Sequence, residues 1–449
     1  MQFSRFTQSV GPRRRHTLVL AASVVAAATL SSCAAGGGGS TSAATSAGGS
    51  AAAGGGSLTV LVEGGGHGEL QPVADKFAQQ NGTKVTFVEL PYDGLYDRIN
   101  SELSTGNVSA DVVALDAIWL TAFKDGLAPL DDIMTTQVQA NLFPSLIKEA
   151  RAGSHFVGVP AWTNAQLLFY RKDLFEDAKN KAAFKSKYGY DLAAPTTWAQ
   201  YNDIATFFTD NASTTGVKYG ADVKGKVETE WLAQVLQAGA KSVVLDDKGQ
   251  VIVNDAAHKM ALDEYVKLAR AQKAPPGASQ IDWAAAQNLF NQGQLAMTRF
   301  WAHAYTQIPK DSAVYGKVGV VPMPAGPGGV AAIPGAWYLS VPAKGPQQSL
   351  AKKFVQFAYD NNALGLDTAL GLVATKSALE KDANKAGHEN LTPLIQTLEA
   401  SGTQPRPAHP KWQQIVDTVL VPTIQKAVDG GDSQQLLDQA KTQIEALIK

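Results

Sequence analysis

The chain has 449 residues, with 39 lysines and arginines against 40 aspartates and glutamates and a single cysteine. This near balance of charge, without a basic stripe, argues against a nucleic-acid-binding protein. One cysteine excludes a disulfide within the chain, so the fold must depend on ordinary hydrophobic cores. The part from residue 57 onward is long enough to form two or three domains.

The N-terminal segment has the pattern of an export signal. Residues 1–16 carry four arginines and no acid, and residues 17–30 form an apolar run of 14 residues. That run suits a signal-peptide core and falls short of the roughly 20 residues that a membrane-spanning helix needs. It ends just before Cys33, as in bacterial lipoprotein signals, which this segment resembles. We therefore interpret residues 1–32 as a lipoprotein signal peptide and Cys33 as the lipidation site. A secretory peptide without a lipid, and export by the Sec or the twin-arginine route, stay open.

The segment after Cys33 predicts a tether. Residues 34–56 consist almost wholly of Ala, Gly, Ser and Thr. Without large apolar side chains, such a segment cannot offset the entropy cost of becoming ordered. We interpret residues 33–56 as a lipid anchor and flexible tether, which predicts a globular body held at the outer face of the cell membrane.

The next part of the chain alternates short strands with helices. Residues 58–62, 84–90 and 111–115 read as strands, and apolar residues at helical spacing over 70–77 and 95–103 read as helices. This alternation predicts an α/β fold with a parallel sheet covered by helices. Ligands in such sheets bind at the carboxyl ends of the strands, here in the loops 63–68, 91–94 and 116–119.

From about residue 164 the pattern changes to longer helices with few strands. Helices are expected near 197–202, 231–239, 283–290 and 348–359, with extended runs at 319–322 and 331–341. The last helix carries Leu436, Leu437 and Ile444 and begins after Asp432 or Ser433, either of which can cap it. Trp198 and Trp412 are expected in the core.

Motifs of catalysis are absent from the sequence. It contains no His-Glu-x-x-His pair, no Gly-x-Ser-x-Gly elbow and no P-loop, and its seven histidines are scattered. We therefore expect no metal, no cofactor and no enzyme activity. Two facing carboxylates can come from anywhere in a chain, so a glycoside hydrolase stays an alternative. Tryptophans beside turns, with nearby Asp, Asn, Arg and His, favour binding of a neutral polyhydroxylated ligand.

Several segments together resemble the extracellular solute-binding proteins of ABC sugar importers. They follow the order of that family from residue 58 to the end, and they are residues 110–119 (ADVVALDAIW), 125–130, 158–175 (GVPAWTNAQLLFYRKDLF), 195–198, 290–297, 334–341 (PGAWYLSV) and 406–410 (RPAHP). The resemblance implies two lobes, each with a mainly parallel sheet flanked by helices, joined by hinge crossovers. Lobe 1 would comprise 57–165 with 337–378, and lobe 2 would comprise 166–336 with 379–449.

The resemblance is nearest to the trehalose- and maltose-binding branch. It implies that a sugar is captured between the lobes and delivered by a monomer to permease subunits served by a cytoplasmic ATPase. A sugar sensor or adhesin is the alternative outside transport. The loop at His67, the pair Asp282-Trp283 and the sequence Pro334-Gly-Ala depart from that branch and leave the sugar open. The residues expected to bind the ligand are Asp116, Asn164, Trp301, Trp337, Gly335 and Arg406, followed by His67, Trp119, Trp162, Asp282 and His303.

Overall fold

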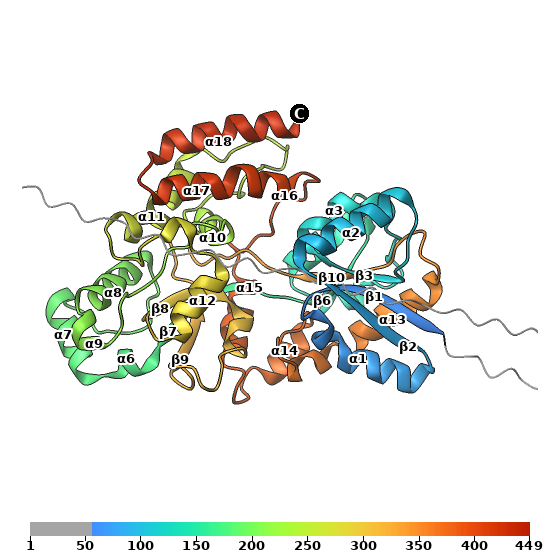
Figure 1. Ribbon diagram of the computed structural model, residues 1–449, viewed down its shortest axis with the longest axis horizontal. Coiled ribbons are helices and arrows are strands. Elements are labelled where there is room, and N and C mark those ends of the chain that lie inside the picture. The colour runs from blue at the N-terminus through green and yellow to red at the C-terminus, as the bar shows by residue number, and fades with distance from the viewer. Residues whose placement is uncertain (1–55) are drawn as a thin grey trace, which may run out of the picture. The chain divides into compact units, whose positions relative to one another are not determined.

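The computed structural model describes residues 56–449. The predicted signal peptide, Cys33 and all but the last residue of the predicted tether therefore lie outside the described residues. Over residues 56–449, no helix combines the length and the apolar character that a membrane crossing requires. The described part contains a five-stranded sheet, a three-stranded sheet and the short two-stranded sheet of β4 and β5, and we call the elements around the two larger sheets the first and the second lobe (Figure 1).

The sheet of the first lobe is mixed. Its five strands lie in the order β2-β1-β3-β10-β6, where β1 pairs in parallel with β2 and β3 while β10 pairs antiparallel with β3 and β6. The chain thus returns from the second lobe to place β10 inside the first sheet. The bounds are β1 Ser57–Glu63, β2 Lys84–Leu90, β3 Val112–Asp116, β6 Val159–Trp162 and β10 Trp337–Ser340.

Helices cover both faces of this sheet (Figure 1). Helix α1 buries Leu70, Val73 and Phe77, which share one helical face. Phe77 meets Phe354 and Phe357 of α13 edge-on, each at 5.2 Å between ring centroids. The elements around the sheet are α1 Gly66–Asn81, α2 Tyr92–Thr105, η1 Ala117–Trp119, α3 Leu120–Phe123, η2 Lys124–Gly126, α4 Thr136–Ala140, α5 Pro144–Ala150, β4 Arg151–Ala152, β5 His155–Phe156, α13 Gln348–Asp360 and η5 Asn362–Asp367.

The sheet of the second lobe is antiparallel, which corrects the expectation of a mainly parallel sheet there. Its order is β8 (Met297–Trp301), β7 (Gln166–Arg171), β9 (Val318–Pro322), and β7 runs opposite to both neighbours. The helical excursion after β7 brings the chain back to the edge where β7 ended, since Met297 lies opposite Tyr170. The returning strand must therefore run in the reverse direction.

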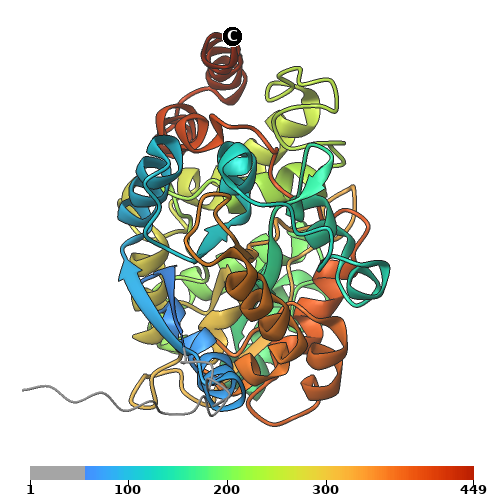
Figure 2. The ribbon, with the colours of Figure 1, turned by 90° about the vertical axis from the view of Figure 1, so that its right-hand side faces the viewer.

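Helices make up most of the second lobe. The side chain of Asp432 accepts a hydrogen bond from the Gln435 amide, so Asp432 rather than Ser433 caps the last helix, which ends at the edge of the described body (Figure 2). Trp412 is buried as predicted, whereas Trp198 is only half-buried and the core prediction for it is wrong, because only its indole N–H reaches inward, to the buried Gln237. The bounds are α6 Lys172–Glu176, α7 Ala178–Tyr188, α8 Trp198–Asp210, α9 Ala212–Thr215, α10 Thr229–Gln237, α11 Ala256–Arg270, η3 Ala278–Gln280, α12 Trp283–Asn291, η4 Ala302–Tyr305, α15 Leu391–Glu399, α16 Trp412–Ile415, the π-helical η6 Val416–Leu420, α17 Val421–Val428 and α18 Ser433–Ile448.

Three chain segments pass between the lobes. Two of them lie side by side, because Ala165 bridges Pro334 and the Gly335 amide donates to the Asn164 carbonyl at 2.9 Å. The third follows η5 and leads into α14 (Lys376–Asp382), which contacts both η5 and α15. The buried side chain of Asn362 ties this third segment to the first lobe, since it donates to Ala161 of β6 and accepts from the amide of Thr375.

Candidate functional site

Asp116 lies at the carboxyl end of β3, where the parallel strands were expected to present ligand-binding groups. Its carboxylate is nearly buried and fully engaged by protein donors. One oxygen accepts from the backbone amide of Ile118 at 3.3 Å and from Arg406 at 2.9 Å, and the other accepts from the Tyr92 hydroxyl at 3.0 Å. Asp116 therefore caps the turn η1 and at the same time contacts the second lobe.

Arg406 reaches Asp116 from the segment that precedes α16. Its side chain is 7% exposed and that of Asp116 is 11% exposed, so the ion pair is largely shielded from water. Nη2 makes the contact with Asp116, whereas Nε has no hydrogen-bond partner among the described residues. Two residues expected to bind the ligand thus lie together.

Three acidic residues that the sequence did not single out surround this pair. Burial, followed by the charge of Asp116, raises the pKa of Glu63 to about 7. Burial raises the pKa of Glu149 to about 8 although the Tyr338 hydroxyl donates to it, and burial also raises the pKa of Glu228. Glu63 ends β1 and could have been found from its position at the ligand edge, but nothing in the sequence marks Glu149 or Glu228.

Four aromatic side chains gather beside Asp116 in the first lobe. Trp162 and Trp337 stack at 5.8 Å between ring centroids with an interplanar angle of 19°. Trp119 meets Trp337 at 5.7 Å edge-on and Tyr92 at 4.6 Å. Trp119 and Trp162 are buried within this cluster, and Trp337 alone among the three indoles stays half-buried.

A second aromatic group faces the crossovers from the second lobe. The half-buried Trp301 ends β8 and lies 5.6 Å from Trp283, the first residue of α12. A Cβ atom at Gly335 would lie only 2.6 Å from the Trp301 ring. Gly335 is therefore needed for Trp301 to pack directly on the crossover backbone.

Asn164 and His303 meet at the first crossover. The Asn164 side-chain nitrogen lies 2.7 Å from Nδ1 of His303, and its oxygen accepts from the Ala165 amide. Burial lowers the pKa of His303 to about 4, so the ring is neutral near pH 7 and Nδ1 can accept the Asn164 hydrogen bond. The Asn164 side chain is thus oriented by His303 of η4 and by the crossover backbone.

His67 and Asp282 lie in exposed positions and do not join these groups. His67 pairs with Glu89 of β2, whose carboxylate also accepts from the Gly65 amide. Asp282 accepts from the Ala285 amide and so caps α12. The structure gives each of them a local partner, and their roles toward a ligand stay predictions.

Hollows flank the Asp116–Arg406 contact. A cavity of about 320 Å³ lies on one side, with Thr121 and Glu149 of the first lobe facing Leu245 and Gln404 of the second. On the other side a groove of about 430 Å³ runs between Tyr96 of α2 and the segment 410–418. The two lobes therefore meet at Asp116 and Arg406 with open space on both sides.

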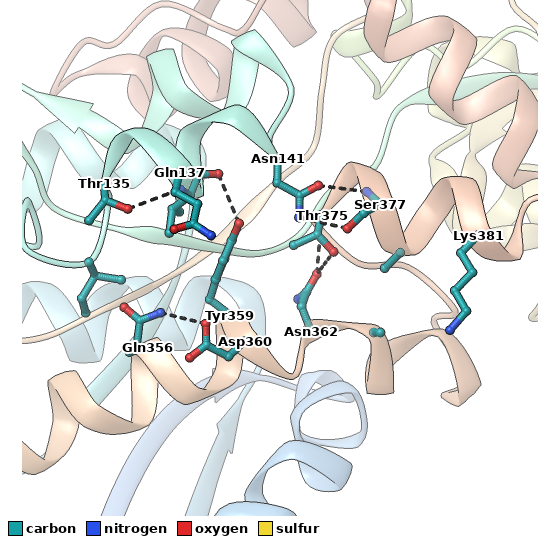
Figure 3. Close-up of a pocket in the computed structure, with 14 residues that line it drawn as sticks. Thr135, Gln137, Asn141, Gln356, Tyr359, Asp360, Asn362, Thr375, Ser377 and Lys381 are labelled. Atoms are coloured by element: carbon teal, nitrogen blue, oxygen red, sulfur yellow. Dashed lines mark hydrogen bonds between the residues drawn. The ribbon is translucent and has the colours of Figure 1, made fainter.

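A separate groove of about 600 Å³ lies beside the third crossover (Figure 3). Its lining includes Asn141, Tyr359 and Thr375, and its amide and hydroxyl groups largely bond one another. None of the predicted ligand-binding residues lines it. Over residues 56–449, no group of three or more His, Cys, Asp or Glu side chains is arranged to hold a metal ion.

The chain belongs to the bacterial extracellular solute-binding protein family, whose model matches residues 64–363. Members of this family act outside the cytoplasm. A probable ABC transporter-binding protein of Deinococcus radiodurans is 29% identical over 298 residues, covering 64% of this chain and 68% of the relative. A mannitol-binding protein of Pseudomonas aeruginosa is 25% identical over 218 residues, covering 47% of this chain and 46% of the relative. The chain thus matches about two thirds of the length of the first relative and about half of the second.

Solved structures of similar fold are two-domain binding proteins. A maltose-bound protein of T. maritima is 25% identical with a TM-score of 0.71, covering 87% of this chain and 99% of that structure. A solute-binding protein of Agrobacterium radiobacter K84 in complex with ribitol has a TM-score of 0.70 at 24% identity, covering 88% of this chain and 99% of that structure, and shows the fold alone. The expected two-lobed α/β fold is confirmed, and the protein is an extracellular solute-binding protein.

Proposed function

We propose that this protein captures a disaccharide or short oligosaccharide, of the trehalose or maltose type, between its lobes and delivers it to an ABC permease. The main support is that each lobe carries an aromatic group at the crossovers: Trp337 pairs with Asp116 across the first sheet, and Trp301 of the second lobe packs on Gly335. Aromatic faces stack on the C–H faces of a sugar, and carboxylates accept hydrogen bonds from its hydroxyls. The neighbour in complex with maltose supports the same ligand class.

The partially exposed indoles are the proposed stacking surfaces. Trp337 in the first lobe and Trp301 in the second are both half-buried and both lie at a crossover. The guanidinium of Arg406 supplies further N–H donors for a sugar oxygen, and Glu63 at the end of β1 supplies a further acceptor or donor. No cofactor takes part in this scheme, and ATP hydrolysis belongs to the partner subunits.

Lipidation of Cys33 by an acyl chain such as palmitate would hold the body near its permease, as a monomer on the outer face of the membrane. Fractionation of cells that express the full chain or its Cys33→Ser variant tests the anchor. The wild type should stay with the membrane and the variant should be released. An equal distribution of both would contradict the lipidation.

Calorimetric titration of the full chain with maltose, trehalose, maltotriose and mannitol tests the function. We expect saturable binding of at least one sugar without products, and a loss of affinity of roughly tenfold or more in Trp301→Ala, because stacking and burial of an aromatic face contribute about 1.5–3 kcal/mol. Trp198→Ala is the matched control, since Trp198 is also half-buried and its indole bonds to Gln237 within the second lobe. Equal losses in both variants would contradict the site, and turnover of a glycoside would support the hydrolase alternative.

A further inference from the structure

We propose that the Asp116–Arg406 ion pair is a latch that keeps the lobes together when no ligand is bound. The inference rests on the proposed function for its meaning in ligand capture, but the latch is a property of the ligand-free chain. Both partners were expected to bind ligand, and in the structure each is engaged by the other at 2.9 Å across the lobes.

Each end of the latch is held firmly by its own lobe. Asp116 is oriented by the Tyr92 hydroxyl and the Ile118 amide, both in the first lobe. Arg406 stands between Pro405 and Pro407, whose rings restrict the backbone. Thr403 before this segment donates to Thr397 of α15 at 2.6 Å, and Trp412 after it is buried in the second lobe. The backbone positions of both partners are therefore set by their own lobes, and a movement of one lobe against the other separates the pair.

The charges around the pair make Arg406 hard to replace. Carboxyl groups facing it are Asp116, Glu149 of α5 and Glu228 at the start of α10, together with the Tyr92 hydroxyl. A guanidinium left among these groups without Asp116, or Asp116 left without the guanidinium, would be a buried charge without its partner. Opening of the lobes returns both groups to water, so loss of the pair favours the open state.

Two hollows lie between the lobes beside the ion pair. The cavity of about 320 Å³ on one side and the groove of about 430 Å³ on the other separate the lobes beside the pair. Apolar burial between the lobes is therefore interrupted where the ion pair lies. The latch sets how often the ligand-free cleft is closed, and a ligand adds contacts to a state that is already populated.

Distances between spin labels test the latch without any sugar. The labels are placed at Ser101→Cys on α2 and Ser186→Cys on α7, two exposed residues in different lobes (Figure 1), in the full chain carrying Cys33→Ser. We expect one main short distance in this background and a shift toward longer distances in Arg406→Gln, with the closed-to-open ratio falling roughly tenfold or more. Arg406→Lys keeps the charge and should give an intermediate ratio.

The matched control is Arg171→Gln, which removes a bidentate ion pair with Asp173 inside the second lobe. It should leave the distance distribution unchanged. The proposal is overturned if Arg406→Gln retains the closed distance, or if the background chain shows only the open distance without ligand. Thermal melts confirm that each variant is folded. If Arg406→Gln does not fold, the distances in Arg406→Lys test the latch in its place. Failure to bind any sugar would contradict the proposed function and leave these distances unaffected.

Discussion

Two buried clusters of charge in this protein differ in what they join. In the second lobe, Lys224 contacts Asp222 at 2.6 Å and Glu230 at 2.8 Å, and all three are buried within one body. Between the lobes, Asp116 and Arg406 form a less completely covered pair whose partners belong to different lobes. The charges of the first cluster become exposed to water only when the second lobe unfolds. The charges of the second pair become exposed when the lobes move apart. Similar chemistry therefore contributes to stability in one place and to movement in the other.

The buried cluster of the second lobe also positions an aromatic residue. Lys224 donates to the Arg299 carbonyl of β8 at 2.7 Å, and its ammonium lies 5.4 Å from the centre of the Trp283 ring. The next residue, Gly225, packs so closely on Ser279 that an added Cβ would lie 2.4 Å from the Ser279 backbone. The cluster thus holds the segment that leads into Trp283.

The largest expected effect is the loss of Lys224. Lys224→Met leaves Asp222 and Glu230 without their common cation in a lobe that cannot open to water, so the free energy of unfolding should fall by about 3–5 kcal/mol. Denaturant unfolding measures this change. Lys226→Met, at an exposed position two residues away, should change it by less than about 0.5 kcal/mol. If both variants lowered the free energy of unfolding by a similar small amount, the Lys224 cluster would not contribute to stability as expected.

A smaller effect is expected from the titration of Glu149, which faces Tyr338, Arg406, Asp116 and Lys148. Burial raises the pKa of Glu149 from 4.5 to about 8. Between these values the folded chain holds a proton that the unfolded chain has released, so the free energy of unfolding falls as the pH rises through this window. Glu149→Gln should flatten that part of the profile. Parallel profiles for both proteins between pH 5 and pH 8 would show that Glu149 does not titrate in this way.

The smallest effect concerns the exposed rim of the second lobe. Asp282 caps α12, so Asp282→Ala should lower the free energy of unfolding by about 1 kcal/mol, whereas Asp282→Asn keeps the cap. If the carboxylate also binds sugar, as the resemblance implied, the asparagine variant loses affinity while its stability is retained. Unchanged affinity in that variant would assign Asp282 to the helix cap alone, and leave the aromatic residues as the contribution of the second lobe to binding.

Much of the first lobe could be predicted from the sequence because its signals are local. Strands alternating with amphipathic helices predicted a parallel sheet, and that sheet in turn placed Asp116 at the end of β3. From the sequence, Asp116 and Arg406 were each predicted to contact the ligand, and a contact between the two was not predicted. That they bind each other depends on the closeness of the lobes, which no local pattern encodes.

The second lobe was harder to predict because its features depend on tertiary contacts. The direction of β8 depends on where a long helical excursion returns, and a strand of five residues carries no sign of its partner's direction. The position of a tryptophan beside a turn also proved a poor guide to exposure. Trp231 is fully buried in α10, whereas Trp198 at the start of α8 is not. The raised pKa values of Glu149 and Glu228 arise from burial by distant segments.

The three bonds of Asp116 constrain how this protein can diverge. The same carboxylate caps a turn, orients Tyr92 and pairs with Arg406. A substitution that adapts the cleft to a different solute would therefore also reset the resting balance between its open and closed forms. Trp301 offers a second place to change specificity, and because its ring packs on Gly335, a substitution there also acts on the crossover backbone.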